Sequence, residues 1–88
     1  MSGETYPATG GQPRQPDVRV DAVGLKCPLP IIELGKAANL LDSGLIELIS
    51  DDPVALQDVP AWCRMRSAAL LDQATDGHGV SVFIVRVG

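Results

Sequence analysis

The residue of this chain whose type and setting best suit it to chemistry is Cys27, which stands directly before two closely spaced prolines. The segment around it reads Gly24, Leu25, Lys26, Cys27, Pro28, Leu29 and Pro30. A helix can begin at Pro28 or at Pro30, because proline lacks the N–H that has no partner in a first helical turn. Cys27 would then lie at the positive end of a helix dipole and beside Lys26, and both favour the nucleophilic thiolate. We therefore predict a moderately lowered pKa for Cys27; the alternative is a small buried cysteine that only packs.

The other residues that could carry chemistry have simpler explanations. Cys63 lies ten residues after Pro53, which is about 15 Å along a helix, so we expect no disulfide with Cys27 and predict a packing role. His78 is the only histidine and lies between two glycines in a turn, where we predict a solvated side chain without a role. Two cysteines and one histidine at no recognised ligand spacing predict no metal site.

Short strands and helices must position these residues, and the hydrophobic pattern predicts where they lie. Val18 and Val20 alternate with charged residues, which is typical of a strand with one buried face. Apolar residues recur at helical spacing from Pro28 to Leu41. Strands are predicted over 18–20, 45–50, 69–75 and 80–87, and helices over 28–41 and from 53 to about 66.

The second helix has a strong start signal and one internal proline. Asp52 is predicted as the N-cap, with Pro53 at the first helical position, and Asp51 as a solvated neighbour of the cap. Pro60 removes one backbone donor inside the helix. We therefore expect a kink or a split near Val59.

The predicted order of elements is β-α-β-α-β-β. The two crossovers favour parallel pairing of the first strands, and the short turn at 76–79 requires a hairpin between the last two. We predict an α/β (α+β) fold of two layers, with both helices on one face of a four-stranded mixed sheet. Residues 17–88 are predicted to form this domain. Residues 1–16 contain three glycines and three prolines without a hydrophobic period, which predicts a disordered tail.

Composition narrows the classes of function. The net charge is −4, from 7 basic and 11 acidic residues, and the basic residues are scattered, so direct tight binding to nucleic acid is not expected. No stretch approaches the roughly 20 apolar residues of a membrane span, and the first residues lack the apolar run of a signal peptide. Two cysteines are few for a secreted disulfide scaffold, so we predict a cytoplasmic protein with reduced thiols. A chain of 88 residues leaves little room for a deep cofactor pocket, and no cofactor is predicted.

The segment around Cys27 resembles the cysteine-proline-x-proline signature of the TusA/SirA-like sulfurtransferases. The resemblance covers about residues 17–87 and continues through Asp51-Asp52-Pro53, Asp58-Val59-Pro60, Trp62-Cys63 and Thr75-Asp76-Gly77. It implies a two-layer βαβαββ sandwich, in agreement with the pattern above. It also implies that Cys27 accepts a persulfide sulfur and hands it on, while Gly24, Leu25, Lys26, Pro28 and Pro30 shape the site.

The same resemblance implies the partners. In the best-known member the donor is a cysteine desulfurase, and the sulfur passes through relay proteins to a thiolated tRNA uridine. We expect protein partners here, because a site on so small a domain must be shallow. Two other classes of function remain open, namely a thiol redox switch that forms a mixed disulfide at Cys27 and a regulatory or adaptor domain in which Cys27 is structural.

Overall fold

The fold is built from six helices and strands in the predicted order. The computed structural model describes residues 15–88, and the part of the predicted tail that falls on residues 1–14 lies outside them. The elements are β2 (Val18–Asp21), α1 (Leu29–Leu40), β3 (Gly44–Ser50), α2 (Ala55–Arg66), β4 (Ala69–Thr75) and β5 (Ser81–Val87). The predicted α+β fold class is confirmed.

The four strands form one mixed sheet in the order β2-β3-β5-β4. β2 runs parallel to β3, with Val18 opposite Ile46, as expected for two strands joined by a crossover through a helix. β5 is antiparallel to both of its neighbours, β3 and β4. The last strand of the domain therefore lies inside the sheet, between two strands that precede it in the chain.

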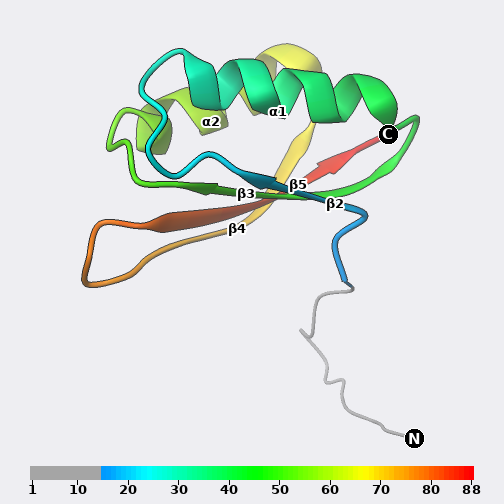
Figure 1. Ribbon diagram of the computed structural model, residues 1–88. Coiled ribbons are helices and arrows are strands. Elements are labelled where there is room, and N and C mark those ends of the chain that lie inside the picture. The colour runs from blue at the N-terminus through cyan, green and yellow to red at the C-terminus, as the bar shows by residue number, and fades with distance from the viewer. Residues whose placement is uncertain (1–14) are drawn as a thin grey trace, which may run out of the picture.

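Both helices cover one face of the sheet, which makes the molecule a two-layer sandwich (Figure 1). The apolar stripe of α1 that the sequence predicts supplies Leu34 and Ala38 to the core, and Ala37 is buried beside them. The sheet meets it with side chains that alternate along β3 and β5. The largest fully buried side chains of the core are Phe83, Leu34, Ile46, Leu48, Val59 and Val85.

The second helix differs from its prediction at two points. The prediction of Asp52 as the N-cap and Pro53 as the first helical residue is wrong, since Val54 is the N-cap and regular α-helix begins at Ala55. Asp52 instead opens a tight turn in which its carbonyl accepts from the Ala55 N–H at 3.0 Å. Of the kink or split predicted near Val59, the split is wrong, since one helix runs through Pro60. Proline removes a single backbone bond, and the burial of Val59 and Trp62 on either side of Pro60 holds both halves against the sheet.

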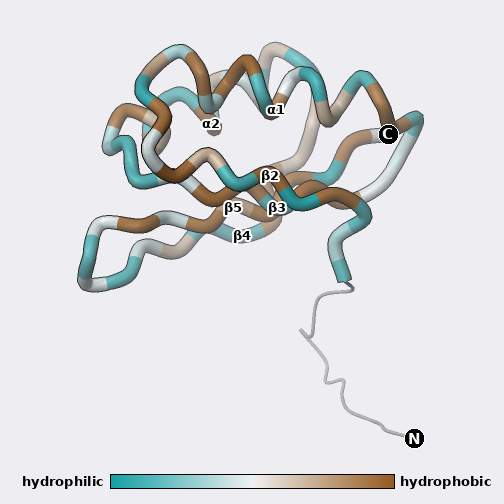
Figure 2. Tube along the Cα trace, in the orientation of Figure 1, coloured by the Kyte–Doolittle hydropathy of each residue, from teal (hydrophilic) through white to brown (hydrophobic). Residues whose placement is uncertain are grey.

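The hairpin of β4 and β5 extends past the cover of the helices, with a hydrophilic loop at its tip (Figure 2). Asp76 organises that loop, because its Oδ1 accepts from the backbone N–H groups of His78 at 2.7 Å and Val80 at 3.0 Å. Gly79 has a φ of 83°, in the left-handed region that glycine tolerates. His78 is exposed here, as the sequence predicts.

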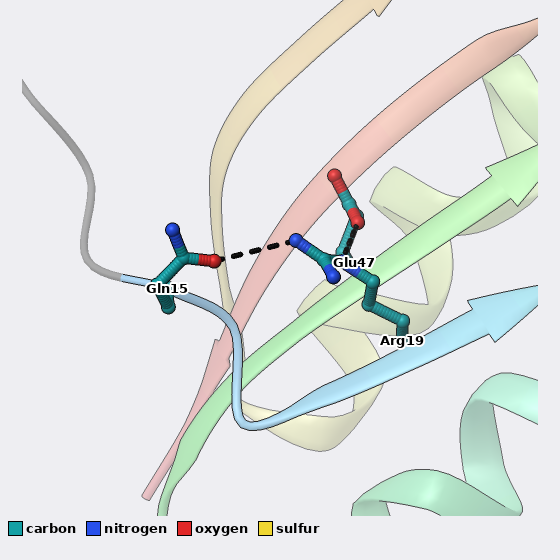
Figure 3. A network of polar contacts seen from close by, with 3 residues as sticks. All are labelled: Gln15, Arg19 and Glu47. Atoms are coloured by element: carbon teal, nitrogen blue, oxygen red, sulfur yellow. Dashed lines mark hydrogen bonds and ion pairs between the residues drawn. The ribbon is translucent and has the colours of Figure 1, made fainter.

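The face of the sheet opposite the helices carries a small polar network (Figure 3). Arg19 on β2 and Glu47 on β3 are directly opposite in register and form an ion pair with Nε and Oε1 2.7 Å apart. A second guanidinium nitrogen of Arg19 donates to the Gln15 side chain at 3.3 Å. This network links the segment before β2 to the sheet, at an exposed position where an ion pair adds little stability. Within residues 15–88, no helix has the length and apolar character to cross a membrane.

Candidate functional site

The candidate site lies where two loops meet at one edge of the sheet. β2 and β3 are parallel neighbours, so the loops that follow their carboxyl ends lie side by side. The first loop carries Cys27, and the second carries Asp51 and Asp52. They are joined by the Gly24 N–H, which donates to Asp51 Oδ1 at 2.9 Å, and by the Cys27 N–H, which donates to Asp52 Oδ2 at 2.6 Å.

The loop before Cys27 is shaped by Gly24 and Leu25. Gly24 has a φ of 87°, which a residue with a side chain rarely adopts. Leu25 is half-buried and packs against the core, and its N–H donates to the Ala22 carbonyl at 3.1 Å. The loop is thus fixed at both ends, by a core contact and by the carboxylates of the neighbouring loop.

The helix that follows Cys27 begins at Leu29, between the two starts that the prolines allowed. Pro28 is the N-cap residue and is exposed, whereas Pro30 lies in the first turn of α1 and is fully buried. The Cys27–Pro28 peptide bond is cis. The Lys26 side chain is exposed, and its backbone carbonyl accepts from the Leu29 N–H at 2.8 Å.

Asp52 clamps the two loops together. Its side chain is almost wholly buried, with 6% exposed, and both of its oxygens are used. Oδ2 accepts from the Cys27 N–H at 2.6 Å, and Oδ1 accepts from the Val54 N–H at 3.1 Å, in the turn that leads into α2. Its own N–H donates to the Ser50 hydroxyl at 3.1 Å. One carboxylate therefore sets the position of the cysteine relative to the second helix.

The thiol of Cys27 is exposed and faces a second carboxylate. Cys27 Sγ donates to Oδ2 of Asp58 at 3.3 Å. Asp58 lies in the first turn of α2, where its N–H donates to the Val54 carbonyl at 2.9 Å. The reacting atom of the candidate site thus lies beside a carboxylate 31 positions farther along the chain.

The prediction of a lowered pKa for Cys27 is wrong, since the pKa is raised above its ordinary value. The hydrogen bond from the thiol to Asp58 contributes most, because it stabilises the protonated form. Partial desolvation and the negative charges of Asp58 and Asp52 add to the same effect. At neutral pH the free protein therefore holds Cys27 mainly as the thiol.

The helix start cannot offset these carboxylates. Of the first backbone groups, Pro28 and Pro30 have no N–H, and that of Leu29 is taken by the Lys26 carbonyl. The donors nearest the cysteine are thus missing or already used, which weakens the effect of the helix start on the pKa of Cys27.

The two loops also present apolar side chains to solvent. Val23, Leu29 and Val54 are 48%, 45% and 42% exposed. Leu29 lies two residues after Cys27. The N–H groups of Val54 and Cys27 both donate to the Asp52 carboxylate. An exposed thiol on loops that also expose apolar side chains suits contact with a protein partner.

Cys63 is buried in the core, with 3% exposed, and burial raises the pKa of its thiol. Both cysteines are free. Among residues 15–88, no group of three or more histidine, cysteine, aspartate or glutamate side chains is arranged to hold a metal ion.

Cys63→Ala should lower the free energy of unfolding by about 1 kcal/mol, because a small cavity replaces the sulfur in the core. Denaturant unfolding measures this loss, and Cys27→Ala, at an exposed position, is the matched control with a smaller effect. In the folded wild-type protein a thiol reagent should label Cys27 and spare Cys63. Equal labelling rates for the two cysteines would contradict the buried position.

Sequence reasoning did not pair Cys27 with either carboxylate. Asp52 was predicted only as a helix cap, and no role was predicted for Asp58. The parallel pairing of β2 and β3 was the available signal, because it brings the loops after both strands to the same edge. Asp58 comes from α2, and its distance from that edge depends on how α2 packs on the sheet.

Comparison with known proteins finds a matching family model and a similar solved structure. Residues 18–87 match the family model described as "Sulfurtransferase TusA". The crystal structure of a SirA-like protein from Desulfitobacterium hafniense is similar, with a TM-score of 0.73 and 22% sequence identity. The alignment covers 81% of this chain and 97% of that chain, and at this identity the likeness supports the fold alone.

Proposed function

Because the chain belongs to the TusA family of sulfurtransferases, which act as sulfur carriers, we propose that Cys27 accepts a sulfur atom as a persulfide and passes it to an acceptor protein. The observation that carries this proposal is the exposed thiol of Cys27 on a loop that Asp51 and Asp52 anchor. We propose residues 17–88 as the carrier domain and residues 1–16 as a tail outside it.

The geometry favours proteins as donor and acceptor. The thiol lies on an open surface with apolar neighbours, so the partner must supply the rest of the reaction site. The donor we propose is a cysteine desulfurase-like enzyme that carries a persulfide, and the acceptor is a relay protein with a thiol. Thiolation of a tRNA uridine is one pathway that such a relay serves. The negative net charge favours delivery through proteins over direct binding of RNA.

The reaction needs a reduced Cys27 and no cofactor. Sulfur moves between thiols by attack of one sulfur on the outer atom of a persulfide, in the manner of thiol–disulfide exchange. A compartment that keeps thiols reduced, such as the cytoplasm, is therefore the proposed place of action.

Incubation with a cysteine desulfurase and free cysteine should load the wild-type protein with one sulfur atom, because the donor persulfide meets an exposed thiol. Mass spectrometry should show the added sulfur, and a reductant should remove it. A protein that stays unloaded with the desulfurase and also with a chemical persulfide donor would contradict the proposal.

The same measurement separates the other two classes of function. After purification without reductant, a mixed disulfide between Cys27 and a small thiol would indicate a redox switch. An unmodified protein that no persulfide donor can load would indicate an adaptor domain.

A further inference from the structure

We propose that Asp58 is a second catalytic residue, whose carboxylate holds a proton on the sulfur group of Cys27, so that loading is restrained and delivery is favoured. This inference rests on the proposed function of Cys27 as a sulfur carrier. It assigns to one aspartate opposite effects on the two halves of the transfer.

The contact on which the proposal stands is the 3.3 Å hydrogen bond between Cys27 Sγ and Asp58 Oδ2. Asp52, the other carboxylate that acts on the cysteine, already accepts from two backbone N–H groups with its two oxygens. Within the described residues, the Asp58 carboxylate bonds to the thiol alone. Asp52 therefore holds the backbone, whereas Asp58 acts on the sulfur itself.

The other charged groups near the sulfur do not cancel this effect. Lys26 lies on the same loop as Cys27 and has an exposed side chain. Asp51 and Asp52 approach from the loop after β3, and Asp58 from α2. The hydrogen bond from the thiol to Asp58 and, after it, the negative charges of Asp58 and Asp52 raise the pKa of Cys27.

In the loading step, the sulfur of Cys27 attacks the outer sulfur of the donor persulfide. The new S–S bond forms on Cys27 while the S–S bond of the donor breaks. The thiol first gives up the proton that it shares with Asp58, and this proton ends on the departing donor thiolate, so that a thiol and a persulfide become a persulfide and a thiol, with no oxidant or reductant consumed. Because the thiolate is the attacking form, a carboxylate that keeps the proton on sulfur slows this step.

In the delivery step, the thiolate of the acceptor attacks the outer sulfur of the Cys27 persulfide. The S–S bond on Cys27 breaks and the outer sulfur stays with the acceptor. The proton that the Cys27 persulfide carried passes through Asp58 to the Cys27 sulfur, so that a persulfide and a thiolate become a thiol and a persulfide anion. An anionic persulfide would repel the incoming thiolate, whereas a protonated one accepts the attack. The carboxylate of Asp58 disfavours the anion, and it therefore favours delivery.

The substitution Asp58→Asn separates the two effects, because it removes the charge and keeps the size of the side chain. Alkylation of Cys27 by iodoacetamide at neutral pH should become faster by roughly fivefold, the order expected when one unit charge is removed from about 4 Å in water. Its pH profile should shift toward lower pH. Release of sulfur to a small thiol, measured after loading both proteins with glutathione persulfide, should become several-fold slower.

Two further variants control the comparison. Asp42→Asn carries the same change of charge at an exposed position after α1 and should leave both rates unchanged. Asp58→Glu keeps a carboxylate, so loading should stay restrained and delivery should stay favoured. This variant also provides a test if the Asp58→Asn protein does not fold.

The proposal is overturned if Asp58→Asn leaves either rate unchanged, or if both rates move in the same direction, as simple unblocking of the sulfur would cause. A wild-type protein that no donor can load would instead count against the proposed function. In that event the inference about delivery fails together with the proposed function. The alkylation rates alone then decide whether Asp58 holds the proton on Cys27.

Discussion

Cys27→Ser should abolish sulfur loading and leave the fold intact. A hydroxyl stays protonated at neutral pH and is a poor nucleophile toward a persulfide, so the variant should show no added sulfur by mass spectrometry. The residue is exposed, and a serine hydroxyl can also donate to Asp58, so the melting temperature should change little. Peptide mapping of the loaded wild-type protein should place the sulfur on Cys27.

Cys63→Ser is the internal control for this result. Cys63 is buried in the core, away from solvent and from any partner, so its loss should cost stability and leave loading in place. Loading of Cys27→Ser to the wild-type level would remove Cys27 from the mechanism. Loss of loading in both variants, with both folded, would show that the two sulfurs act together.

Asp52→Ala should be the most destabilising change at the site. The carboxylate is almost wholly buried, and its removal leaves the N–H groups of Cys27 and Val54 without a partner. Both hydrogen bonds are partly buried, and a fully buried donor left unpaired costs about 1–3 kcal/mol, so the two together should cost on the order of 2–3 kcal/mol in the free energy of unfolding. For a domain of this length that is a drop of about 10–20 °C in melting temperature.

Asp51→Ala provides a matched control one residue away. Asp51 accepts a single bond, from the exposed Gly24 N–H, so its loss should cost less than about 1 kcal/mol. Thermal unfolding of the two variants measures the difference. Equal melting temperatures would mean that Asp52 does not clamp the loops as described.

Much of the fold could be predicted because its signals are local. The alternation at Val18 and Val20, the apolar stripe of α1 and the turn at 76–79 each act within a few residues, and the observed strands and helices follow them. The crossover rule then leaves few arrangements for the sheet. Pro60 could not be judged in this way, because the packing of Val59 and Trp62 decides whether the helix continues through it.

The electrostatics of the site could not be predicted, because the decisive contact is not local. Lys26 and the helix start are visible beside Cys27 in the sequence, and both argue for a thiolate. The carboxylate of Asp58 comes from another helix, and its position depends on how α2 packs on the sheet. A direct hydrogen bond at the sulfur outweighs a dipole whose nearest N–H groups are absent or occupied.

The central place of β5 also governs how this domain can fold during its synthesis. Residues 81–87 are the last of the domain to emerge from the ribosome, yet they pair with both β3 and β4. Until they emerge, β4 has no strand to pair with. The part of the core beside β3 also lacks the side chains of Phe83 and Val85. Such pairings between distant segments form slowly, and a chain halted before Ser81 would expose apolar strand edges. During translation the nascent domain therefore exposes apolar strand surface almost to its end, until the final strand completes the four-stranded sheet.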